Sequence, residues 1–129
     1  MFMIPIPPRV RLTLFCAFAM LILILSLMPS PPDIVKDVIP RDKAQHALAY
    51  ACLTVLGGWA LTPFWGAACA WRRAFGLAIV YGVLLEGAQA LSGYRAAEFG
   101  DAVANSFGAG MIYLVWWIFF HSRDLNSCK

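Results

Sequence analysis

Charged residues are scarce in this chain. Asp, Glu, Lys and Arg together make up 13% of its 129 residues, whereas an average soluble domain contains about 25%. Apolar residues make up 61%, and a soluble protein of this size could not bury so much apolar surface. The composition therefore excludes a water-soluble globular domain and predicts that most of the protein faces lipid.

The chain also lacks the patterns of metal sites and of disulfide frameworks. Its four cysteines have no CxxC or Cys/His ligand spacing. Three of them, Cys16, Cys52 and Cys69, lie in apolar stretches, where a thiol behaves as a small hydrophobe. We expect no metal, no cofactor and no disulfide. Basic residues form no run and the net charge is only +3, so we also expect no nucleic-acid partner.

Long apolar runs make up most of the chain. A transmembrane helix needs about 17–25 residues, and four such runs cover about residues 12–28, 43–61, 74–91 and 101–120. We predict an all-α fold, a single polytopic membrane domain of four transmembrane helices that takes up the whole chain. A cleaved signal peptide is the alternative for the first run. No small-residue cleavage site follows that run, so we expect the helix to be retained.

Helix boundaries follow from proline, glycine and capping residues. Proline stops a helix because it lacks a backbone donor, and an aspartate before an apolar run caps the helix N-terminus. The boundary signals are Pro29-Ser-Pro-Pro32, the cap Asp42, Thr62-Pro63 and Ser92-Gly93. They predict a loop over residues 63–73 and a short polar turn over residues 94–100.

Lysine and arginine near the span ends predict the orientation. One side of the membrane receives Arg9, Arg11, Arg72, Arg73, Arg123 and Lys129, and the other receives Lys36, Arg41, Lys43 and Arg95. The excess of six to four predicts that both termini lie in the cytoplasm and that the first and third connections lie outside.

Polar residues inside the last three runs gather toward one membrane face. Residues three or four apart share a helix face, and three stripes follow this spacing. The stripes are Asp42, His46 and Tyr50; Glu86, Gln89 and Gly93; and Glu98, Asp101, Asn105 and Gly108. A charge inside a bilayer costs about 2.5–3.5 kcal/mol on insertion scales, so such residues are rarely idle. The predicted binding residues are Asp42, Lys43, His46, Tyr50, Glu86, Gln89, Arg95, Asp101 and Asn105.

Each of these residues also has a structural interpretation. A polar side chain in a membrane helix can simply satisfy another one and hold the bundle together. The structural alternatives are helix caps for Asp42 and Asp101, a loop ion pair with Glu98 or Asp101 for Arg95, a hydrogen bond from Glu86 or Gln89 for His46, aromatic packing for Tyr50, and an inter-helix lock for Glu86.

Three motifs in this order resemble the VanZ-like family of small bacterial membrane proteins: Asp42-Lys43-x-x-His46-x-x-x-Tyr50, Glu86-x-x-Gln89, and Arg95-x5-Asp101-x3-Asn105-x2-Gly108. The likeness covers about residues 30–120. It implies a four-helix domain in the bacterial inner membrane and, for the founding member, low-level resistance to the glycopeptide teicoplanin. For most of the family it implies no defined biochemical activity.

Three functions fit the predicted site. The first is recognition of an anionic lipid-linked headgroup, such as that of a cell-envelope precursor, with Lys43, Arg95 and His46 holding phosphate. The second is a membrane enzyme acting on lipid phosphate, a phosphatase or transferase, with His46, Glu86 and Asp101 as catalytic candidates. The third is an accessory protein whose polar residues only lock the helices. The sequence leaves the oligomeric state open.

Overall fold

Four long helices account for nearly all of the described chain. The structure is a computed structural model that describes residues 6–28, 41–93 and 98–120, with residues 41 and 42 described by their backbone alone. Its helices are α1 (Pro8–Leu27), α2 (Arg41–Trp65), α3 (Ala67–Ser92) and α4 (Phe99–Phe120). Each is long and apolar enough to cross a membrane. The prediction of an all-α, four-span membrane protein is confirmed.

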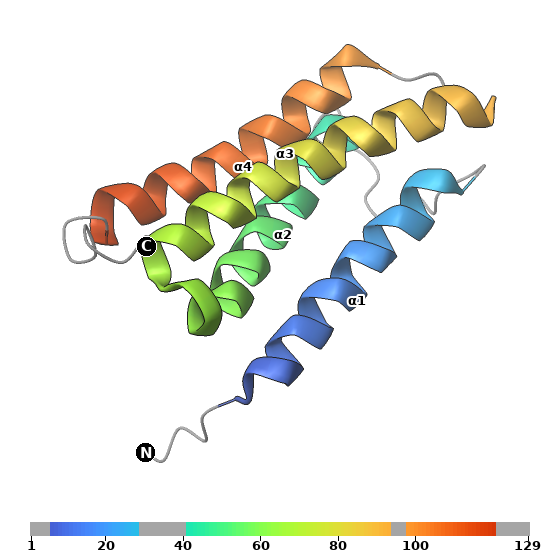
Figure 1. The fold of residues 1–129 in the computed structure, drawn as a ribbon. Coiled ribbons are helices and arrows are strands. Elements are labelled where there is room, and N and C mark those ends of the chain that lie inside the picture. Colours follow the sequence, from blue (N-terminus) through green and yellow to red (C-terminus); the bar gives the residue numbers. More distant parts are fainter. Residues whose placement is uncertain (1–5, 29–40, 94–97, 121–129) are drawn as a thin grey trace.

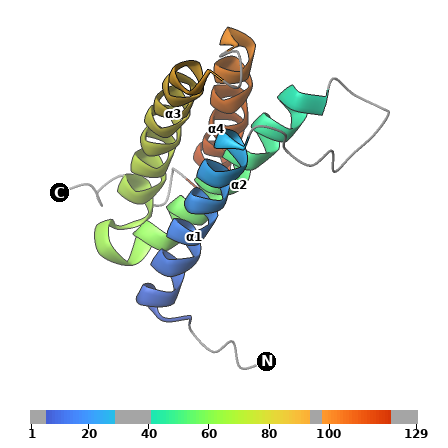
Figure 2. The ribbon, with the colours of Figure 1, turned by 90° about the vertical axis from the view of Figure 1, so that its right-hand side faces the viewer.

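α2 lies at the centre of the bundle. It packs against α1, α3 and α4, and α3 and α4 also lie side by side (Figures 1 and 2). α1 packs along the outside of α2 and α3 and contributes only Ile22 to the buried residues. The start of α1 and the end of α4 lie toward the same end of the bundle (Figure 1).

Glycine residues let the helices approach closely. Gly108 of α4 faces α2 so tightly that a Cβ at this position would overlap the backbone of Ala47. Gly58 lies against the ring of Trp71, which stacks on Trp116 with 5.6 Å between ring centroids. Lipid provides no hydrophobic drive between helices, so close packing of this kind holds them together. The contact at Gly108 therefore sets the separation of α2 and α4 next to the predicted polar site.

The predicted end of α2 at Thr62-Pro63 was wrong, because the helix continues to Trp65. A proline in the last turn removes only one helical hydrogen bond. The Thr62 hydroxyl donates to the Gly58 carbonyl at 2.6 Å, and the Gly66 amide donates to the Thr62 carbonyl at 3.0 Å. The Gly66 amide thereby continues the helical hydrogen-bond pattern past the proline to the end of the helix.

The predicted loop over residues 63–73 was also wrong, because Gly66 alone separates α2 from α3. Gly66 has a φ of 73°, a left-handed conformation that favours glycine. α3 begins at Ala67, so Arg72 and Arg73 lie in its early turns. The remaining helix ends differ from the prediction by at most four residues.

The expectation of no disulfide was wrong for Cys69, which is disulfide-bonded. Cys16 and Cys52 are free. An apolar sequence around a thiol indicates how that thiol packs. It does not show which other thiol the fold brings within bonding distance.

Candidate functional site

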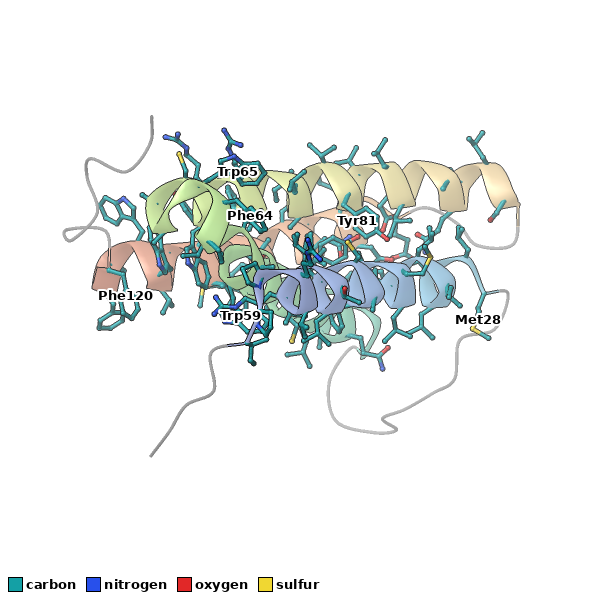
Figure 3. The ribbon with its side chains drawn as sticks, turned by 60° about the horizontal axis from the view of Figure 1, so that its bottom comes forward. Met28, Trp59, Phe64, Trp65, Tyr81 and Phe120 are labelled. Atoms are coloured by element: carbon teal, nitrogen blue, oxygen red, sulfur yellow. The ribbon has the colours of Figure 1, made fainter. Side chains whose placement is uncertain are left out.

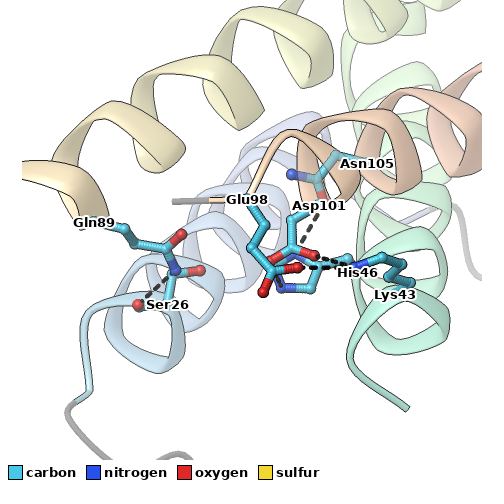
Figure 4. A network of polar contacts seen from close by, with 7 residues as sticks. All are labelled: Ser26, Lys43, His46, Gln89, Glu98, Asp101 and Asn105. Atoms are coloured by element: carbon cyan, nitrogen blue, oxygen red, sulfur yellow. Dashed lines mark hydrogen bonds and ion pairs between the residues drawn. The ribbon is translucent and has the colours of Figure 1, made fainter. Parts of the chain in front are cut away.

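Asp101 is the centre of a polar cluster between α2 and α4 (Figure 4). Its side chain is 3% exposed, although the residue lies in the first turn of α4. Asp101 Oδ1 lies 3.5 Å from Lys43 Nζ, and Oδ2 lies 3.7 Å from His46 Nε2. A buried carboxylate is costly unless partners surround it. Lys43 and His46 of α2 therefore offset the free-energy cost of burying the Asp101 carboxylate.

His46 is held on its other side by Asn105. The hydrogen bond between His46 Nδ1 and Asn105 Oδ1 is 3.0 Å long. Lys43 and His46 are three residues apart, and Asp101 and Asn105 are four apart, so the two helices present facing stripes. The structural interpretation of His46 named a partner on the third span, whereas this hydrogen bond comes from α4. Asp101, the other α4 residue beside His46, was a catalytic candidate together with it.

Lys43 forms the exposed rim of the cluster. Its Nζ lies 3.0 Å from Glu98 Oε2, and the two side chains are 47% and 58% exposed. A Cβ at Gly100 would lie 2.7 Å from Lys43 Cε, so a larger residue there would displace the lysine. The polar path thus runs from an exposed ion pair down to the buried Asp101.

A second polar group links α3 to α1. Gln89 is 2% exposed, and its side-chain amide donates to the Ser26 carbonyl at 2.8 Å (Figure 4). The Tyr81 hydroxyl donates to the Ala19 carbonyl at 2.6 Å. Ser26 lies in the last turn of α1, where backbone carbonyls have no helical partner. Side chains of α3 therefore anchor the least buried helix of the bundle.

Gly82 of α3 brings the two polar groups together. A Cβ at Gly82 would lie 3.1 Å from Tyr50 Cε1 and 3.3 Å from Asn105 Nδ2. Tyr50 lies within electrostatic reach of Glu86, and its ring centroid is 6.4 Å from that of Tyr81. Glu86 is 9% exposed. The absence of a side chain at Gly82 allows α2, α3 and α4 to meet here.

The predicted binding residues fall into three sets. Those in direct contact are Lys43, His46, Asp101 and Asn105. Those in the adjoining group are Tyr50, Glu86 and Gln89. Those outside the described side chains are Asp42 and Arg95.

An N-cap role does not explain Asp101, and the capping role expected of Asp42 lies outside the described side chains. α2 begins at Arg41 and α4 begins at Phe99, so Asp42 and Asp101 lie inside first turns and not before them. A carboxylate in the first turn still complements the helix dipole. The Asp101 side chain, however, is directed at α2, which makes it an inter-helix residue.

Four participants were not among the predicted binding residues: Glu98, Gly82, Tyr81 and Ser26. Helical spacing places Glu98 in the stripe of Asp101, and it could also have indicated Gly82, which lies four residues before Glu86. Ser26 takes part through its backbone carbonyl. No side-chain pattern reveals such a contact.

Carboxylates outnumber cations among the described side chains at this end of the bundle. One lysine stands against the carboxylates of Glu86, Glu98 and Asp101. Both ring nitrogens of His46 are directed at side chains of α4, whereas a general base must reach a proton of the substrate. Across the described ranges, no three His, Cys, Asp or Glu residues form a group that could hold a metal ion. Among the described side chains, this end of the bundle therefore offers mostly hydrogen-bond acceptors, and the ring of His46 is engaged within the bundle.

Comparison with known proteins leaves the function to be argued from this geometry. No family model, no curated protein and no solved structure matches the chain. The likeness to the VanZ-like family therefore remains a proposal.

Proposed function

We propose that this chain is a VanZ-like integral membrane protein that binds the headgroup of an anionic lipid-linked molecule at its polar end. The supporting observation is the polar path from the exposed Lys43–Glu98 pair to the buried Asp101. Polar residues that served only to lock the helices would not need an exposed lysine at the rim. The buried end of the cluster belongs to the bundle, and its rim is exposed.

Binding exchanges one ion pair for another. An exposed ion pair such as Lys43–Glu98 contributes only about 0–1 kcal/mol, so a phosphate replaces Glu98 at little cost. Asp101 stays 3.5 Å from Lys43 Nζ and keeps the ammonium in position. The released Glu98 then accepts hydrogen bonds from hydroxyl, amide or ammonium groups of the ligand. The headgroup therefore carries phosphate together with donors, as a lipid-linked sugar or peptide does.

The surroundings of the rim suit a ligand with a lipid tail. Leu48, Phe99 and Val103 lie close in sequence to the cluster residues and are all exposed. In a membrane protein such side chains face acyl chains. A lipid-linked ligand keeps its tail along these residues while its headgroup reaches Lys43.

In this proposal the polar end faces outward from the bacterial inner membrane and both termini lie in the cytoplasm. Arginines at the opposite end of the bundle support this orientation by the positive-inside rule. Labelling from one side of the membrane distinguishes the two orientations.

Native mass spectrometry of the gently extracted protein tests the proposal. We expect the unchanged protein to retain a phosphate-containing, lipid-linked molecule, and Lys43→Ala to lose it. Lys43→Arg retains the ligand because it keeps the charge. Glu98→Gln retains at least as much of the ligand as the unchanged protein, since the side chain that competes with phosphate for Lys43 no longer carries a charge.

Ser106→Ala is the matched control, because the exposed Ser106 hydroxyl bonds only to the Ala102 carbonyl of its own helix. Equal retention by the unchanged protein and Lys43→Ala contradicts the proposal. If Lys43→Ala and Glu98→Gln both lose thermal stability and no bound lipid is found, the cluster is a structural lock. If the VanZ-like proposal holds, Lys43→Ala also increases teicoplanin susceptibility at an unchanged protein level.

A further inference from the structure

The end of the bundle opposite the polar site is rich in arginine. Leu12 packs against Leu61 and Ala70, which places the start of α1 beside the turn between α2 and α3. The arginines gathered there are Arg9, Arg11, Arg72 and Arg73. The described carboxylate side chains, those of Glu86, Glu98 and Asp101, lie toward the other end. Within the described side chains, the arginines therefore lie at this end of the bundle and the carboxylates lie toward the other end.

Two of these arginines are stacked on tryptophan rings. Arg11 Cζ lies 4.9 Å from the ring centroid of Trp59, and Arg73 Cζ lies 4.3 Å from that of Trp65. Figure 3 shows Trp59 and Trp65 at this end of the bundle and Met28 at the other. Stacking uses the face of a guanidinium group and leaves N–H groups at its edge for other partners.

The depth and chemistry of these pairs match a phospholipid headgroup. Tryptophan prefers the membrane–water interface, which places both guanidinium groups level with lipid phosphates. Arginine binds phosphate through two parallel hydrogen bonds. Arg11 Nε donates to the Ile6 carbonyl at 3.0 Å, which orients its two terminal nitrogens without using them.

We propose that the Arg11–Trp59 and Arg73–Trp65 pairs are binding sites for anionic phospholipids of the adjoining leaflet. This proposal goes beyond the headgroup site at Lys43, since it concerns the opposite end of the bundle and an ordinary membrane lipid. The tryptophans hold the guanidinium groups in place, and the arginines bind the lipid phosphate. An anionic headgroup is preferred because its net charge complements this end of the protein.

Reconstitution into nanodiscs of phosphatidylcholine with or without phosphatidylglycerol tests the proposal. Native mass spectrometry then counts the lipids of each kind that stay bound. We expect the unchanged protein to retain phosphatidylglycerol preferentially and to unfold at a higher temperature when it is present. Each of Arg11→Ala and Arg73→Ala lowers the preference about fivefold, the factor that corresponds to about 1 kcal/mol for a basic residue near an anionic surface.

Two further variants separate lipid binding from folding. Arg73→Lys keeps the charge but cannot bind phosphate bidentately, so it retains part of the preference. Ser106→Ala, which removes an exposed hydroxyl away from both arginine–tryptophan pairs, leaves phosphatidylglycerol retention unchanged. Inorganic phosphate added to phosphatidylcholine nanodiscs does not raise the unfolding temperature. The proposal is overturned if the unchanged protein retains both lipids equally, if the double Arg11→Ala, Arg73→Ala variant keeps the preference, or if free phosphate reproduces the stabilisation.

Discussion

Replacing Gly108 by alanine tests how tightly the polar site depends on the approach of α2 and α4. A Cβ at this position would overlap the carbonyl group of Ala47 and lie 2.8 Å from its Cα. These atoms are backbone, so no side-chain rotation relieves the overlap. The two helices must move apart at this point.

The expected loss of stability follows from two effects. Overpacking a tight contact costs about 1–3 kcal/mol. Separation of the helices also lengthens the 3.0 Å bond between His46 and Asn105, and an inter-helix hydrogen bond in a membrane contributes about 0.6 kcal/mol. Gly110→Ala provides the control, because the nearest atom to its Cβ would be Phe75 Cε2 at 3.8 Å. Both variants gain the same helix propensity, so Gly108→Ala is expected to be about 2 kcal/mol less stable than Gly110→Ala.

Unfolding by sodium dodecyl sulfate in mixed micelles measures this difference as a free energy of unfolding. The same samples report the headgroup site, since Gly108→Ala should also lose the co-purified lipid that Gly110→Ala retains. If the two variants unfold at the same detergent fraction, α2 and α4 do not approach each other as described. The conclusion that the polar site depends on the close packing of α2 against α4 would then be refuted.

Two other predictions concern α1 and the orientation of the bundle. Gln89→Leu removes the donor to the Ser26 carbonyl and weakens the docking of α1 by about 0.6 kcal/mol. Hydrogen–deuterium exchange should become faster in the last turn of α1, whereas Gly87→Ala, whose Cβ would meet no atom within 4 Å, should not change it; equal exchange in both variants would show that Gln89 does not hold α1. In a chain whose native cysteines are replaced by alanine, an impermeant thiol reagent applied outside the cell should label Arg95→Cys and not Arg72→Cys. The reverse pattern would place the polar end in the cytoplasm.

Helical spacing predicted which faces of the helices carry the polar residues. His46 follows Lys43 by three residues and Asn105 follows Asp101 by four, and both pairs lie at one interface. The spacing of polar residues along the sequence identifies one face of a single helix, and it does not say which face of another helix lies opposite. The rotation of one helix against another decides which faces meet, and this rotation depends on packing contacts such as that of Gly108 with Ala47.

The connection between α2 and α3 shows a second limit of local reasoning. The boundary signal Thr62-Pro63 predicted a long loop, but a left-handed Gly66 alone connects the two helices. Many residues are compatible with either a helix or a loop, and their tertiary contacts decide between them. Here Trp71 stacks on Trp116, which favours an early start of α3.

The sequence by itself determined that the protein lies in a membrane, how many times it crosses, and at which end its polar groups gather. These properties depend on composition and on the helical period, which are local. Only the tertiary structure decided that His46 pairs with Asn105 and Asp101, that Gln89 anchors α1, and that Lys43 and Glu98 form the exposed rim. Such pairings depend on how closely and at what rotation the helices pack, and glycines far apart in the chain set both.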